Sequence, residues 1–196
     1  MLYIYHRVYN DLILQKVNDI LVEILKGDKL AERALYDMFK RRWYMLAQRY
    51  ARTTHDANDI MQEGLIQIYT DLHQYDARKS QFSTWSSRVI VNTALRYLKK
   101  NNWHNTLLEV EKSDVINSEQ DDIYSDLAAQ ELVYMIQQLP LGYRIVFNMN
   151  VIEGYTHKEI SKKLNIAEGT SKSQLSKAKR MLRNQLENQL KAHSNG

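Results

Sequence analysis

A chain of 196 residues has room for two small folding units, and a composition of 44% hydrophobic and 26% charged residues is typical of a globular protein. It contains no cysteine, which excludes a disulfide framework and thiolate metal sites. Residues 1–9 hold no sustained apolar stretch with a small-residue cleavage site, so we expect a cytoplasmic protein with neither a secretion signal nor a membrane insertion. One proline and six glycines leave few breaks, which predicts an all-α protein.

The net charge of +4 is small, but the charged residues are strongly clustered along the chain. Residues 55–76 hold five acids and no lysine or arginine, whereas residues 78–103 hold six bases and no acid. Residues 104–127 then carry seven acids and one lysine, and residues 156–196 carry nine bases and three acids. The sequence therefore predicts two basic surfaces separated by an acidic segment.

The first clear helical pattern covers residues 56–72, where apolar and small side chains recur at spacings of three and four and so define a core-facing side. On the opposite side, Asp59, Gln62, Glu63 and Ile66 form a mixed acidic, amide and apolar patch. Such a patch suits a protein partner with basic side chains, and an ordinary solvated helix face explains it equally well. A catalytic carboxylate pair or a metal site is a poorer interpretation, because no histidine joins the acids at ligand spacing.

A turn-like stretch then leads into a second predicted helix, which begins near Phe82 and runs to about Lys100. One side is apolar, and the other carries a stripe made of Trp85, Arg88, Asn92, Arg96 and Lys99. Cations neutralise phosphates, asparagine can bond base edges and an aromatic ring can stack on an unstacked base. The stripe therefore favours nucleic-acid binding, although a buried core tryptophan explains Trp85 nearly as well.

Residues 104–127 are polar, lack a sustained helical period and carry like charges that extend a chain. A linker is the simplest interpretation, and the alternative is a solvated acidic helix whose second half, from Ser118, begins the next domain through a cap. The predicted organisation is thus one helical domain over residues 1–103, an acidic linker over 104–127 and a second helical domain over 128–196.

The second domain carries a helix-turn-helix pattern. Pro140 lies where a proline can open a helix, and residues 156–182 then read as a short helix, a tight turn and a longer basic helix. We expect Asn165 to adopt the left-handed conformation at the turn and the long helix to bury Leu175, Ala178 and Leu182. Its other side places small donors before long cations, as a helix in the major groove requires; a solvated basic helix is the alternative.

These two blocks, residues 56–100 and 139–182, resemble the sigma-70 family, specifically its compact extracytoplasmic-function group. The likeness extends over about residues 26–186 and implies region two in the first domain and region four in the second, with region three missing. It implies a protein that binds core RNA polymerase and directs promoter-specific transcription initiation by binding rather than by covalent catalysis, without a metal or cofactor.

The resemblance also assigns roles to individual residues. The polymerase-binding signature of the family matches Asp59, Gln62 and Glu63, beside which Ile66 completes the mixed patch. The resemblance implies that the minus-ten element is opened, and then bound as a melted single strand, by these residues: Arg78, Lys79, Ser80, Gln81, Phe82, Trp85, Arg88, Asn92, Arg96 and Lys99. The duplex minus-thirty-five element is expected to be read by a helix that starts near Gly169, with contacts from Thr170, Lys172, Ser173, Ser176, Lys177 and Arg180. Ser171 lies along the buried Leu175 stripe and is not expected to touch DNA.

Three further interpretations remain open on the sequence alone. The chain could be a helix-turn-helix regulator that binds duplex DNA without polymerase. It could be a metal-dependent enzyme acting on nucleic acid through Asp56, Asp59 and Glu63, which we consider the weakest alternative. The acidic face could also bind an inhibitory anti-sigma protein, a partner that the resemblance implies for many family members.

Overall fold

The computed structural model describes residues 2–100 and 127–194, with side chains for residues 12–100 and 131–191. In that part of the chain the protein is all-α, as predicted, and contains no strand. The helices are α1 (Leu2–Leu25), α2 (Lys29–Tyr50), α3 (Thr54–Asp71), the 3-10 turn η1 (Leu72–Gln74), α4 (Phe82–Lys100), α5 (Leu127–Gln137), α6 (Leu141–Phe147), the π-helical turn η2 (Asn148–Ile152), α7 (His157–Leu164) and α8 (Glu168–Ser194). The predicted acidic linker lies outside the described residues except for Leu127. Within the described ranges, no helix is long and apolar enough to span a membrane.

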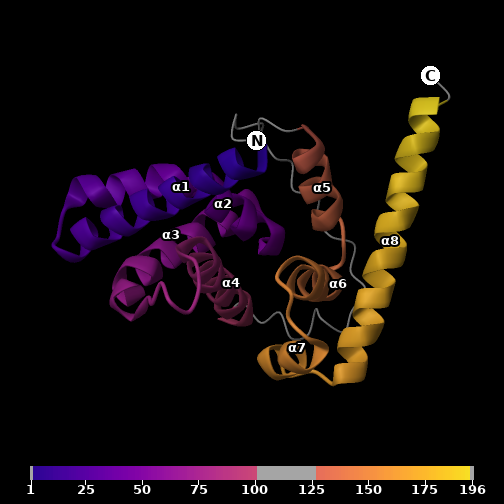
Figure 1. The fold of residues 1–196 in the computed structure, drawn as a ribbon. Helices are drawn as coiled ribbons and strands as arrows, with labels where there is room; N and C mark the ends of the chain where they lie inside the picture. Colours follow the sequence, from indigo (N-terminus) through magenta and orange to yellow (C-terminus); the bar gives the residue numbers. More distant parts are fainter. Residues whose placement is uncertain (1, 101–126, 195–196) are drawn as a thin grey trace.

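Helices α1 to α4 form the first bundle, in which α1 and α2 make an antiparallel hairpin and α3 and α4 pack beside α2 (Figure 1). Its centre is Trp43, which is fully buried and donates its indole N–H to Ser86 Oγ at 3.1 Å. Leu35, Ile60 and Ile90 are fully buried with it. A buried indole needs a hydrogen-bond acceptor, so Ser86 supplies what burial of Trp43 requires.

Side-chain caps fix where α2 and α3 begin. Asp28 accepts a hydrogen bond from the Leu30 N–H at 2.8 Å. Thr53 and Asp56 form a capping box, in which the Asp56 N–H donates to Thr53 Oγ1 at 3.0 Å and the Thr53 N–H donates to Asp56 Oδ2 at 3.1 Å. Because the box fixes the first turn of α3, it also fixes the direction in which the exposed side of that helix faces.

The α3–α4 contact depends on the glycine in the middle of α3. A Cβ built on Gly64 would overlap Cδ1 of Ile90, which is fully buried on α4. The two helices therefore approach more closely here than any side chain at position 64 allows. This close approach sets the distance between the exposed faces of α3 and α4.

We predict that Gly64→Ala lowers the free energy of unfolding by about 1–3 kcal/mol, because overpacking a filled core forces side chains off their rotamers. Ile90→Val removes Cδ1, the atom in the way. In the Ile90→Val background the cost of Gly64→Ala should therefore fall by more than half. Denaturant unfolding of the two single variants and the double variant measures this coupling, and simple additivity of the two costs would contradict it.

Helices α5 to α8 form the second bundle, with α8 running along α5, α6 and α7 and projecting past them at its C-terminal end (Figure 1). Helix α6 begins directly after Pro140, as predicted. Asn165 ends α7 with φ 53° and ψ 48°, which confirms the expected left-handed turn. Helix α8 begins at Glu168, one residue before the expected start near Gly169. Leu175, Ala178 and Leu182 are buried, as the periodicity indicated.

The two bundles are in contact. The C-terminal part of α2 packs against α5 and α6, and one hydrophobic core runs from Trp43 and Tyr50 into Ile145 and Met149. Helical periodicity predicts the two bundles but not this contact, which brings α7 close to α4.

Candidate nucleic-acid interface

The mixed patch predicted on α3 is a surface of the folded chain. Gln62 and Glu63 are exposed, Asp59 is partly exposed, and the Ile66 side chain is 69% exposed. An exposed isoleucine beside acidic groups has the composition expected of a partner site.

Asp59 is held in place from α4. The Tyr97 hydroxyl lies 2.9 Å from Asp56 Oδ1 and 3.2 Å from Asp59 Oδ2, so its one proton is shared between two carboxylates. Burial of the phenol, followed by the hydrogen bond to Asp56, raises the pKa of Tyr97, so the phenol remains a donor across the physiological range. Sequence reasoning missed this residue, because a bond between positions 97 and 59 leaves no periodic signal.

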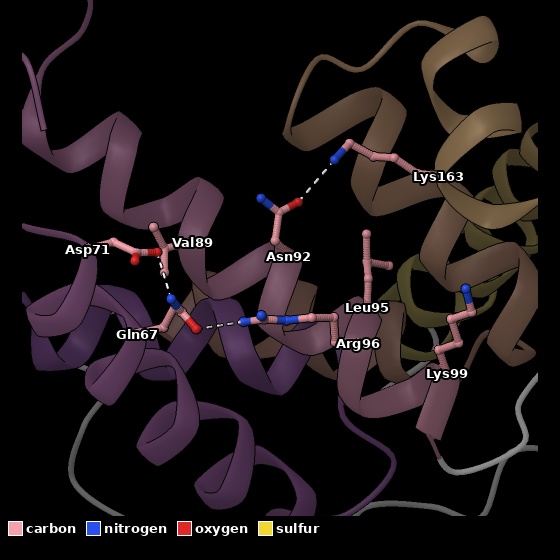
Figure 2. Close-up of a pocket in the computed structure, with 8 residues that line it drawn as sticks. All are labelled: Gln67, Asp71, Val89, Asn92, Leu95, Arg96, Lys99 and Lys163. Atoms are coloured by element: carbon pink, nitrogen blue, oxygen red, sulfur yellow. Dashed lines mark hydrogen bonds between the residues drawn. The ribbon is translucent and has the colours of Figure 1, made fainter. Parts of the chain in front are cut away.

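The polar stripe of α4 is exposed as predicted. Arg88, Asn92, Arg96 and Lys99 all reach the surface, and three of them line a pocket of about 430 Å³ together with Lys163 of α7 (Figure 2). Arg96 donates to Gln67 Oε1 at 3.3 Å, and Gln67 in turn donates to Asp71 Oδ2 at 2.6 Å. These bonds tie the Arg96 guanidinium to α3 on one side of the pocket.

The aromatic residues at the start of α4 divide into one core residue and one partly exposed residue. Phe82 is 2% exposed and packs at centroid distances of 5.3 Å from Phe39 and 5.5 Å from Tyr75. The expectation of a DNA contact at Phe82 is therefore corrected: its ring is part of the core and has no free face for a base. Trp85 packs 5.7 Å from Phe82 and remains partly exposed, so part of its ring is accessible from solvent.

The loop before α4 presents its polar residues to solvent. Arg78 is highly exposed and forms a two-pronged pair with Asp76, with Nε–Oδ1 at 2.9 Å and Nη2–Oδ2 at 2.8 Å. That hydrogen bonding lowers the pKa of Asp76, which stays ionised and offsets the Arg78 charge. Lys79 and Gln81 are exposed and Ser80 is partly exposed. Lys79 is therefore the stronger cation of this loop toward a phosphate.

The exposed side of α8 carries the remaining predicted contacts. Lys172, Ser173, Ser176, Lys177 and Arg180 are exposed, and Thr170 is partly exposed. Lys172 pairs with Glu168 at 2.8 Å, which lowers the pKa of that carboxyl.

Ser171 is fully buried, as expected, and its hydroxyl lies 2.9 Å from Nδ1 of His157. This bond ties the start of α8 to the start of α7 and so fixes the angle at which the basic face is presented. His157 was not identified from the sequence, because the two residues are fourteen positions apart.

Each of the two bundles matches a known family model. The family model for Sigma-70 region 2 matches residues 35–104, and the model for Sigma-70, region 4 matches residues 129–182. The ECF RNA polymerase sigma factor SigW of Bacillus subtilis is 30% identical over 179 residues, covering 84% of this chain and 93% of the relative. The chain belongs to the sigma-70 family, in its extracytoplasmic-function group.

Other relatives agree with this assignment. The ECF RNA polymerase sigma-E factor of Escherichia coli is 25% identical to this sigma factor over 185 residues, or 88% of this chain and 96% of the relative. The solved structure of the sigma factor RpoE with the anti-sigma factor NepR from Bartonella quintana has a TM-score of 0.51 at 17% identity, covering 79% of this chain and 96% of that one, which is a likeness of fold. These relatives do not favour the alternative of a polymerase-independent regulator.

Proposed function

We propose that this sigma factor docks on core RNA polymerase through α3 and reads two promoter elements, one with α4 and the loop before it and the other with α8. Residues 1–103 would form the polymerase-binding and minus-ten domain, residues 104–127 an acidic linker, and residues 128–196 the minus-thirty-five domain. The protein acts by binding in the cytoplasm, with no covalent step, cofactor or metal of its own.

The polymerase site is the mixed patch of α3, made of Asp59, Gln62, Glu63 and Ile66. Its support is the exposure of a large apolar side chain within reach of two carboxylates, of which one is held by Tyr97. A basic, partly apolar helical surface on polymerase would complement it in charge and in shape.

The minus-ten site consists of the exposed residues of the α4 stripe and of the preceding loop: Arg78, Lys79, Ser80, Gln81, Trp85, Arg88, Asn92, Arg96 and Lys99. Cations along α4 follow a phosphate backbone, while Asn92 and the exposed part of Trp85 meet unstacked bases. Single-stranded DNA exposes its phosphates and its unstacked bases at the same time, which supports binding of the melted strand.

The minus-thirty-five site consists of Thr170, Lys172, Ser173, Ser176, Lys177 and Arg180 on α8. Short side chains precede long cations, so the first turns of the helix can reach base edges while the later ones contact phosphates. With polymerase holding both domains, binding of one element raises the effective concentration of the other reader, and neither contact needs high affinity alone.

The observation that carries this proposal is the presence of an acidic patch on α3 and two separate basic faces on α4 and α8 of one chain. Run-off transcription with core polymerase on a library of random promoters tests it. We expect transcripts only when polymerase and the protein are both present, from templates enriched in two short elements at a fixed separation. Sequence-specific duplex binding in a gel shift without polymerase, together with no selected transcripts, would instead identify a self-sufficient regulator.

A further inference from the structure

Tyr97 of α4 lies between two carboxylates of α3. Its hydroxyl is 2.9 Å from Asp56 Oδ1 and 3.2 Å from Asp59 Oδ2. The ring packs against the hydrophobic core, so packing fixes where the hydroxyl lies. A phenol has one proton to donate, so at any moment it can donate fully to only one of the two acceptors.

Asp56 is the carboxylate that the fold itself holds in place. Its Oδ2 accepts hydrogen bonds from the backbone N–H of Thr53 at 3.1 Å and of Arg52 at 3.3 Å, and its Oδ1 makes the shorter contact with Tyr97. Negative charge is favourable here, because the N–H groups at the start of a helix carry partial positive charge. Both oxygens of Asp56 therefore have donors within the chain, and this residue caps α3 and anchors the Tyr97 hydroxyl.

Asp59 is the carboxylate that faces outward. Its Oδ2 makes the longer contact with Tyr97, and its Oδ1 lies 3.8 Å from Nδ1 of His55, whose side chain is 84% exposed. A shared proton at 3.2 Å offsets the charge of Asp59 only in part, so the carboxylate is oriented without being neutralised. A carboxylate in that state is suited to accept a charge-assisted hydrogen bond from a cationic partner.

We propose that Tyr97 is a positioning residue of the polymerase site, which holds the Asp59 carboxylate in the orientation that core RNA polymerase binds. The proposal rests on the proposed function, because it takes the α3 patch as the polymerase site. Asp56 anchors the hydroxyl, the hydroxyl directs Oδ2 of Asp59, and Oδ1 is left to meet a cationic group of polymerase. The residue that completes the site on α3 thus comes from α4, the helix proposed to read the minus-ten element.

The effect of Tyr97 should appear in polymerase affinity more than in folding. Asp56 and Asp59 are both partly exposed, so water can replace the hydroxyl at either carboxylate in the free chain. In the complex, an Asp59 side chain that is already oriented spares the ordering that binding would otherwise require.

Tyr97→Phe removes the hydroxyl and keeps the ring in the core. We expect its dissociation constant for core RNA polymerase to rise about fivefold, because the Asp59 carboxylate loses its fixed orientation. Equilibrium binding of the labelled full-length protein measures this, with thermal unfolding as the check on folding. Tyr69→Phe is the matched control, since it removes a phenol hydroxyl that donates to the Glu32 carbonyl at 2.9 Å, and it should bind as the wild type does.

The variant Asp59→Ala separates a role through Asp59 from a general effect on packing. If Tyr97 acts through Asp59, adding Tyr97→Phe to Asp59→Ala should change the dissociation constant by less than about twofold, because the carboxylate to be oriented is gone. A loss as large in the Asp59→Ala background as in the wild type would overturn the positioning role.

Two further outcomes overturn the role of Tyr97: wild-type affinity in Tyr97→Phe, or an equal loss in Tyr69→Phe. If Tyr97→Phe does not fold, Asp59→Glu gives the answer, because it keeps the charge and moves the carboxylate by one methylene relative to the hydroxyl. Asp59→Glu should then lose about fivefold in affinity, and wild-type affinity would show that the orientation of this carboxylate has no effect on binding.

Failure of the proposed polymerase site gives a different pattern. Normal binding by both Asp59→Ala and Glu63→Lys would overturn the site on α3 and the role of Tyr97 with it. Loss of affinity in those two variants, with none in Tyr97→Phe, would overturn the role of Tyr97 alone.

Discussion

Glu63→Lys is expected to abolish binding of this sigma factor to core RNA polymerase while leaving its fold intact. Glu63 is exposed on α3 and takes no part in the core, so reversal of its charge is tolerated in the free chain. In the complex it would set a cation against a basic partner surface, and like charges facing each other across an interface cost several kcal/mol. That corresponds to a loss of roughly 100-fold or more in affinity.

Equilibrium binding of labelled protein to core polymerase measures the effect, with thermal unfolding as the check on folding. Glu187→Lys makes the same charge change on α8 and should bind normally. Retention of wild-type affinity by Glu63→Lys would refute the assignment of the α3 patch. If both variants lost affinity equally, net charge rather than this patch would govern binding.

Arg180→Ala should lower transcription about tenfold from promoters that depend on the upstream element, and little from promoters that do not. Arg180 is exposed on α8 beyond the small donors, where its guanidinium can reach a base edge or a phosphate. Loss of such a contact weakens the binding free energy by about 1–3 kcal/mol. Contacts to the minus-ten element offset this loss only on templates in which that element is strong.

The measurement is run-off transcription from two templates that share the minus-ten element and differ in the upstream one. Lys191→Ala is the control, because Lys191 is an exposed cation of the same helix about three turns beyond Arg180, the last predicted contact. An equal loss on both templates would show that Arg180 supports docking or folding rather than reading of the upstream element. Equal losses in Arg180→Ala and Lys191→Ala would assign the effect to general charge.

The helices that carry function could be predicted from the sequence because each is amphipathic. Burial of Ile60, Ile68, Leu175 and Leu182 repeats with the helical period, so the opposite faces of α3 and α8 follow directly. The turn at Asn165 was equally predictable, since few residue types adopt its left-handed backbone. Periodicity fixes which side of a helix is exposed, and the predicted contacts on α3 and α8 lie on that side.

The remaining features depend on contacts between segments far apart in the chain. The exposure of Phe82 and Trp85 depends on how closely the rings of Phe39 and Tyr75 pack against them. No local sequence pattern predicts that packing. The end of α2 accepts hydrogen bonds from side chains to its backbone carbonyls, such as the one from Asn148 to the Arg49 carbonyl. Because every residue has a carbonyl, no sequence pattern could indicate Asn148 as the donor. Helix α1 lies entirely outside the matched family segments, and its sequence carries no motif that indicates a role.

The π-helical turn η2 makes the contact between the two bundles depend on the number of residues in this segment. Its closing bond, from the Glu153 N–H to the Asn148 carbonyl at 3.0 Å, spans one residue more than an α-helical bond. Removal of one residue here would leave an ordinary α-turn and rotate the later residues about the helix axis by about 100°, carrying Glu153 away from Arg49, with which it forms an ion pair at 3.0 Å. Insertions and deletions at this turn therefore change how the two regions meet even when every other residue is kept. Among relatives of this sigma factor, the length of the segment between α6 and α7 is as informative as its composition.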